Sequence, residues 1–139
     1  MRALLLAGTA ALLGACSLLD EEAYVRYPGA LEYYAEPALI SVPDSVRVGE
    51  TFSVNLATYS SDCIERSHTE SSQSGLSGWV TPYDINRNLQ SKGCGQAMRT
   101  HAHTAELRFD KAGTATVRVS GIRVPGQEQI AFQRTVVVY

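Results

Sequence analysis

The chain has 139 residues, with 12 basic and 14 acidic side chains and a net charge of −2. The basic residues form no cluster, so nucleic acid is not expected as a partner, because phosphate recognition needs grouped Lys and Arg. The length suits a single domain.

An uncharged run of Leu, Ala and Gly from Ala3 to Ala15 follows Arg2 at the start of the chain. The run is too short to span a membrane as a helix, which takes about 20 apolar residues. Its size is that of the apolar region of a secretory signal. We therefore interpret residues 1–15 as a signal peptide.

The run ends in Leu13-Gly14-Ala15-Cys16. This motif resembles the lipobox of bacterial lipoproteins, which has an apolar residue and two small residues before a Cys. The resemblance implies that residues 1–15 are removed and that Cys16 carries fatty acyl chains such as palmitate. Two or more acyl chains give stable anchoring, so the implied partner is a membrane of the bacterial cell envelope. In Gram-negative lipoproteins an Asp after this Cys favours inner-membrane retention, so Ser17 implies the outer membrane.

Residues 16–36 are predicted to be a tether. An acidic cluster at 20–22 and the pair Pro28-Gly29 argue against a long helix. We expect some of the segment's tyrosines to pack on the domain or to lie near lipid headgroups, where tyrosine is favoured, with a recognition role as the alternative. These tyrosines are Tyr24, Tyr27, Tyr33 and Tyr34.

Residues 37–139 show a β pattern. Phe52, Val54 and Leu56 alternate with polar or small residues, which is typical of a half-buried strand. Pro82 predicts a bend or an edge position, and Arg134 predicts a bulge. The expected strands are 38–42, 51–59, 79–85, a short one near 88–90, 104–109, 114–124 and 130–139.

Six or seven strands without a helix fit an all-β, antiparallel two-sheet sandwich of immunoglobulin-like topology. Stretches 43–54 and 112–119 resemble strand regions of bacterial Ig-like domains. The resemblance implies the fold and carries no function. The expected organisation is a signal peptide (1–15), a tether (16–36) and an Ig-like β-sandwich domain (37–139).

With Cys16 assigned to lipid, Cys63 and Cys94 remain in a chain sent to an oxidising compartment. Such a pair predicts a disulfide, with free thiols or a metal pair as the alternative. Strands that alternate in direction place both cysteines at one end, together with loops 60–77 and 91–101 and the Pro125-Gly126 turn. The tether is expected to enter at this end.

Three histidines form the candidate metal site. His101 and His103 are two residues apart and therefore share a strand face, and His68 is expected near the same end. Three imidazoles could hold zinc or copper. The alternative is that they are polar residues flanking a strand.

No catalytic set is recognisable. The chain lacks a GxSxG elbow, an SxxK motif, paired carboxylates and a phosphate loop, so neither enzymatic activity nor a small-molecule cofactor is expected. Polar loops could contact a partner as antibody loops do. We therefore expect a non-catalytic envelope lipoprotein that binds a protein or glycan or supports an envelope assembly, and a periplasmic metal-binding protein using His101, His103 and possibly His68 is the alternative. The candidate partner contacts are Ser71, Ser72, Gln73, Pro125 and Gly126.

Overall fold

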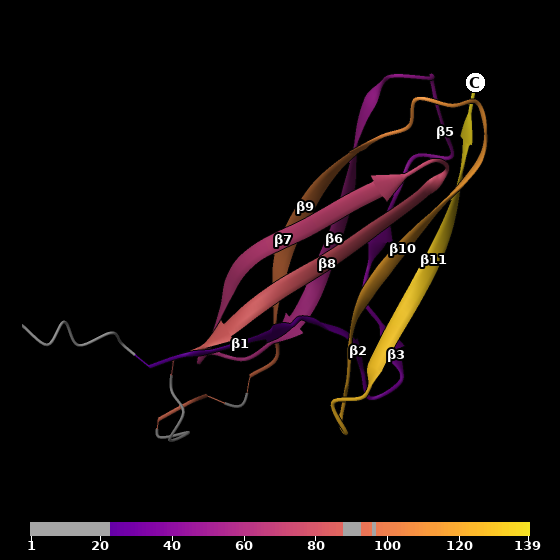
Figure 1. The fold of residues 1–139 in the computed structure, drawn as a ribbon. Helices are drawn as coiled ribbons and strands as arrows, with labels where there is room; N and C mark the ends of the chain where they lie inside the picture. Colours follow the sequence, from indigo (N-terminus) through magenta and orange to yellow (C-terminus); the bar gives the residue numbers. More distant parts are fainter. Residues whose placement is uncertain (1–22, 88–92, 96) are drawn as a thin grey trace, which may run out of the picture.

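A computed structural model describes residues 23–87, 93–95 and 97–139. Every regular element in these ranges is a strand (Figure 1), which confirms the predicted all-β class. The described part of the chain contains no apolar helix that could cross a bilayer. The predicted signal peptide, Cys16 and the short strand expected at 88–90 lie outside the described residues.

Eleven strands follow one another along the described residues. They are β1 (Val25–Pro28), β2 (Ala30–Tyr33), β3 (Glu36–Pro37), β4 (Ile40–Ser41), β5 (Ser45–Val46), β6 (Thr51–Ser60), β7 (Ile64–Ser74), β8 (Ser77–Asn86), β9 (Arg99–Arg108), β10 (Gly113–Val124) and β11 (Gln129–Val138).

All these strands belong to one mixed sheet, which curls on itself into the outline of half a barrel (Figure 1). Its main path runs β1-β8-β10-β2-β6-β4, with β7 paired to β8, β9 to β6 and β11 to β10. The β6–β9, β7–β8 and β10–β11 pairs are antiparallel, whereas β10 pairs in parallel with both β8 and β2. The antiparallel two-sheet sandwich expected from the sequence is therefore replaced by a single curled mixed sheet.

The segment expected to be a tether contributes part of this difference. β1 pairs with the end of β8, from Val25 opposite Asn86 to Pro28 opposite Tyr83. In β2, Ala30 pairs with both β6 and β10. Ala30 and Leu31 are buried, so the described residues from Val25 onward belong to the sheet and not to a tether as expected.

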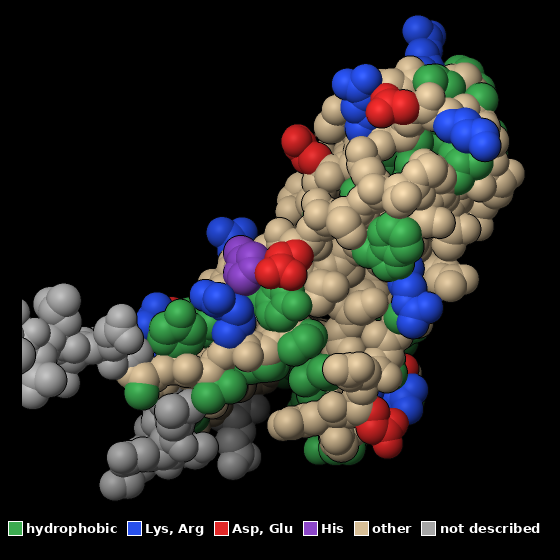
Figure 2. All heavy atoms as spheres, in the orientation of Figure 1, with side chains coloured by type: hydrophobic (Ala, Val, Ile, Leu, Met, Phe, Trp, Pro, Cys, Tyr) green, Lys and Arg blue, Asp and Glu red, His purple; other side chains and the backbone are tan. Residues whose placement is uncertain are grey.

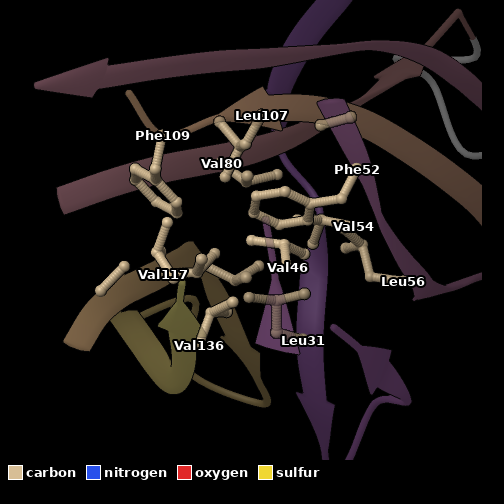
Figure 3. Close-up of a cluster of buried hydrophobic side chains, with 14 residues drawn as sticks. Leu31, Val46, Phe52, Val54, Leu56, Val80, Leu107, Phe109, Val117 and Val136 are labelled. Atoms are coloured by element: carbon tan, nitrogen blue, oxygen red, sulfur yellow. The ribbon is translucent and has the colours of Figure 1, made fainter. Parts of the chain in front are cut away.

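The predicted alternation is correct on the main strands. Phe52, Val54 and Leu56 point into the core, and so do the alternating residues of β9 and β10 (Figure 3). This clustering of apolar side chains on the inner face supplies the main driving force for the curl. The core cluster comprises Leu31, Val46, Phe52, Val54, Leu56, Val80, Ala105, Leu107, Phe109, Ala115, Val117, Val119, Val136 and Val138.

Two local predictions concern Arg134 and Pro82. The bulge expected at Arg134 is wrong, because Arg134 pairs with Val117 in an unbroken β10–β11 register. Pro82 lies in β8, which has neighbours on both sides, so it is not at an edge. It lies next to a register shift in β7 between Arg66 and Thr69, where a missing backbone donor is tolerated.

The Ser-rich segment expected as a loop at 60–77 forms β7 and its hairpin with β8. Ser71, Ser72 and Gln73 pair with residues 80, 79 and 78 and are therefore strand residues rather than loop residues. The hairpin tip lies beside the start of β10, because Ser77 pairs with Thr116. The Pro125-Gly126 turn follows the other end of β10, so the two sets of predicted partner contacts lie at opposite ends of the sheet.

Candidate functional site

The predicted disulfide is present and marks one end of the sheet. Cys63 and Cys94 are bonded, with their Cα atoms 5.4 Å apart. Cys63 lies in the connection after β6, and the start of β1 lies opposite the last residue of β8. We call this end, where β6, β8 and β10 finish and the N-terminal segment enters, the entry end.

The histidines do not converge on a metal site. His101 and His103 share the inward side of β9, as predicted, but their nitrogens bond to protein groups. His68 lies on the outer side of β7, where it stacks on Tyr83 with ring centroids 5.1 Å apart and pairs with Glu70. No group of three His, Cys, Asp or Glu side chains among the described residues is placed to hold a metal ion. The geometry therefore gives the metal hypothesis no support.

His103 instead belongs to a buried polar chain. Its Nε2 lies 3.1 Å from Asp84 Oδ1 and its Nδ1 lies 2.9 Å from Thr69 Oγ1. Thr58 donates its hydroxyl to Asp84 Oδ2 at 2.7 Å. Asp84 and Thr58 are fully buried and His103 is 2% exposed. These bonds satisfy groups that would otherwise be costly to bury.

The order hydroxyl, imidazole, carboxylate in Thr69, His103 and Asp84 is that of a nucleophilic triad. The imidazole and the carboxylate are buried, however, and Thr69 lines neither the groove between β8 and β10 nor the hollow at the entry end. This series of hydrogen bonds connects β7, β8 and β9 across the interior. We therefore assign it a structural role, which is to hold the curled sheet together.

Strands β7 and β9 face each other across the open side of the curl, and no backbone ladder joins them among the described residues. Side chains bridge this seam instead, so backbone groups at two strand edges are satisfied without a further strand. Ser71 and Gln73, expected to meet a partner, are among the bridging residues. The contacts are Arg66 Nη1 to Ala102 O (3.3 Å), His101 Nε2 to Ile64 O (2.9 Å), Thr69 to His103, Ser71 Oγ to Glu106 O (3.5 Å) and the Arg108 amide to Gln73 Oε1 (2.7 Å).

A groove of about 410 Å³ opens on the outer face between β8 and β10. These strands pair only over Ser77–Val80, after which β1 takes the place of β10 beside β8. The strands therefore separate and leave a hollow between them. Its lining is largely polar: Pro28, Thr81, Tyr83, Arg118, Ser120, Gly121, Gln129, Ile130 and Ala131.

Trp79 adjoins this groove, since it pairs across the ladder with Arg118. Its side chain is 42% exposed. Figure 2 shows apolar and basic side chains next to each other over the region of β8 and β10. Arg118 is exposed and has no ion-pair partner in the described part of the chain. Trp79 and Arg118 thus place an aromatic face and an unpaired cation beside a polar groove.

This groove was not predicted from the sequence. One available signal was the alternation in 79–83, where Trp79, Thr81 and Tyr83 occupy the face opposite the buried Val80. An aromatic pair on the outer face of a strand indicates a surface with a binding role. The position of Arg118 beside Trp79 could not be predicted from the sequence, because the β8–β10 pairing is parallel and long-range.

A second hollow, of about 500 Å³, lies at the entry end. Its lining combines aliphatic residues with Tyr27, Tyr33 and Tyr59, and the rings of Tyr33 and Tyr59 are 5.6 Å apart. Burial, with a smaller contribution from the charge of Asp84, raises the pKa of Tyr27 to about 12. Burial therefore favours the neutral form of this phenol.

No family model, curated protein or solved structure matches this chain. Its function is therefore argued from its residues and geometry.

Proposed function

We propose that this chain is a non-catalytic envelope lipoprotein, anchored through acyl chains on Cys16, whose curled sheet binds a glycan in the groove between β8 and β10. The lipobox motif carries the anchoring part of the proposal. The Cys63–Cys94 disulfide supports it, because structural disulfides persist in oxidising compartments such as the periplasm.

The exposed Trp79 beside the unpaired Arg118 carries the binding part. A sugar ring has an apolar C–H face and a rim of hydroxyl groups, which match an aromatic face flanked by polar groups. Trp79 provides an exposed aromatic face beside the groove, and Tyr83 lines the groove with one ring face stacked on His68. Ser120 and Gln129 provide hydrogen-bonding groups. Binding sites commonly combine apolar walls with a few placed polar groups.

Arg118 indicates the charge of the ligand. A guanidinium without a partner in the described structure is free to bind a carboxylate or phosphate in a bidentate manner. An acidic glycan therefore fits the groove better than a neutral one. The sequence predicts a protein or a glycan as the partner. A stable protein interface covers about 800 Å² on each side, so a groove of about 410 Å³ lined by nine residues suits a glycan better.

The single tryptophan of the chain provides the test, because a ligand in the groove should change the emission of Trp79. The soluble form that begins at Ser17 is titrated with acidic and neutral bacterial polysaccharides, followed by fluorescence and calorimetry. We expect binding of an acidic polysaccharide and a loss of at least tenfold in affinity for Arg118→Gln and, by calorimetry, for Trp79→Ala.

Arg134→Gln is the matched control. Arg134 is also an exposed arginine, but it pairs with Val117 and so lies on the opposite face of the β10–β11 ribbon. Its replacement should leave the affinity unchanged. Equal affinities for Arg118→Gln and Arg134→Gln, or no binding to any acidic polysaccharide, would refute the assignment of the groove.

A further inference from the structure

Large apolar and aromatic side chains stand exposed around the hollow at the entry end. Tyr24 is 46% exposed, Val25 49%, Tyr34 65% and Met98 52%. Val25 and Met98 line the mouth of the hollow, and the Tyr34 ring packs edge-on against Tyr33 of the lining, with centroids 4.7 Å apart. Figure 2 shows hydrophobic side chains along the lower edge of the molecule, beside the start of the described chain.

The described residues that line the hollow behind this rim include no Asp, Glu, Lys or Arg. Burial favours the neutral phenol of Tyr27 there. The rim and the lining thus form one uncharged surface, in which phenols and aliphatic groups outnumber the polar side chains of Ser60, Ser61, Asn86 and Gln127. Trp and Tyr are the residues enriched where protein meets the headgroup layer of a bilayer.

Charged side chains near this end are largely neutralised by each other. Arg87 pairs with Glu65, Arg99 with Asp62, and Arg123 with both Glu32 and Glu128. Arg26 and Arg87 lie over the Tyr24 ring, 5.6 and 5.3 Å from its centroid. Among the described residues, a contact with lipid here would therefore depend mainly on apolar and phenolic groups, with Arg26 as a basic side chain beside Tyr24.

The length of the preceding chain limits where this surface can lie. Val25 follows Cys16 by nine residues, which span at most roughly 30 Å when fully extended. If Cys16 carries the acyl chains, as the proposed function requires, the entry end stays within that distance of the bilayer. The opposite end, with the β7–β8 hairpin and Trp79, has no such restriction.

We infer that the entry end rests on the lipid surface, with Tyr24 and Tyr34 at the level of the headgroups and the mouth of the hollow facing the bilayer. The occupant of this apolar surface is the membrane that holds the anchor. This orientation leaves the groove between β8 and β10 on the side of the molecule, open to a ligand. It rests on the proposed lipid anchor but not on the proposed glycan.

Fluorescence quenching by lipid tests the orientation. The full lipidated protein is reconstituted into phosphatidylcholine vesicles whose acyl chains carry bromine, and flotation establishes that it is bound. Tyr34→Trp in a Trp79→Phe background places an indole at the entry end, while the unmodified protein reports from Trp79. Tyr34 and Trp79 are both substantially exposed, so both indoles are accessible to a quencher.

We expect at least a twofold loss of emission from the indole introduced by Tyr34→Trp, at low and at high salt, and no loss from Trp79. Met98→Trp in the same background should give the same result, which keeps the test valid if one variant folds poorly. Floating protein with both introduced indoles unquenched would overturn the orientation while leaving the anchor intact. Protein that does not float would overturn the anchor and the orientation together.

Discussion

Replacing His103 by Leu should destabilise the domain by about 3 kcal/mol, because removing one partner leaves a buried polar group with its full desolvation penalty, about 1–3 kcal/mol and more when that group is charged. His103 lies 3.1 Å from Asp84 Oδ1, and both side chains are at most 2% exposed. Leu cannot donate a hydrogen bond, so one oxygen of a fully buried carboxyl group loses its partner. The hydroxyl of Thr69 also loses its partner, but Thr69 is half-buried and can bond to water.

His68→Leu is the matched control for this substitution. His68 also contacts a carboxylate, Glu70, at 3.1 Å, but the two side chains are 44% and 62% exposed. Exposed ion pairs contribute about 0–1 kcal/mol. The same chemical change should therefore have a small effect at His68 and a large one at His103.

Urea unfolding of the oxidised soluble form measures the difference. A domain of this size has a total stability of about 5–15 kcal/mol, and slopes of about 1–3 kcal/mol/M convert the expected loss into a midpoint shift of about 2 M. Asp84→Asn added to His103→Leu should recover part of the loss, because a neutral amide is less costly to bury than a carboxylate. A loss for His103→Leu no larger than that for His68→Leu would refute the structural role of the pair.

Three further substitutions have defined expectations. Replacing Cys63 and Cys94 by Ser opens a bridge with a sequence separation of 31 and should lower the urea midpoint by an amount equivalent to about 3–4 kcal/mol; an unchanged midpoint would contradict the role of the bridge. Burial raises the pKa of Tyr27 from 10 to about 12, so the folded state holds this proton more tightly than the unfolded state. The resulting contribution to the stability of the folded state is complete below pH 10 and is lost as the pH rises toward 12. Tyr27→Phe should remove about 1–2 kcal/mol of that alkaline loss after allowance for solvent screening, measured by urea unfolding between pH 9 and pH 12; parallel curves for both proteins would contradict it. A Cβ at Gly78 would lie 2.8 Å from Leu107 Cδ1, so Gly78→Ala should cost about 1–3 kcal/mol by overpacking, and a thermal scan showing no decrease in Tm would count against this packing.

The strands with one buried face were predictable from the sequence. In 51–59 and 104–109, apolar residues alternate with polar or small ones because one face meets the core and the other meets water. Cys63–Cys94 was predictable for a different reason, since the other cysteine was assigned to lipid. Both predictions depend on local or compositional signals that need no knowledge of strand neighbours.

Strand β7 could not be predicted in this way. Its residues from Ser67 to Ser74 are all polar, and most of them are exposed. The strand forms because β8 provides a backbone ladder and because side chains such as Gln73 and Thr69 bond to β9. These interactions join segments that are distant in the sequence, so hydrophobic alternation within one segment does not indicate them.

The mixed sheet could not be predicted from the sequence for a related reason. Alternation indicates which face of a strand is buried but not which strand lies beside it. The hydrophobic pattern therefore does not indicate that β10 pairs in parallel with β8 and β2. His101 and His103 show the same limit, because their shared face was predicted correctly while their partners, Ile64, Thr69 and Asp84, came from other strands.

Intact-mass and peptide mass spectrometry of the native protein tests whether it is attached to a membrane through Cys16. We expect that residues 1–15 are missing and that the new N-terminal cysteine carries a diacylglyceryl group and an amide-linked fatty acid. A native protein that retains Met1 and carries no fatty acid would contradict this attachment.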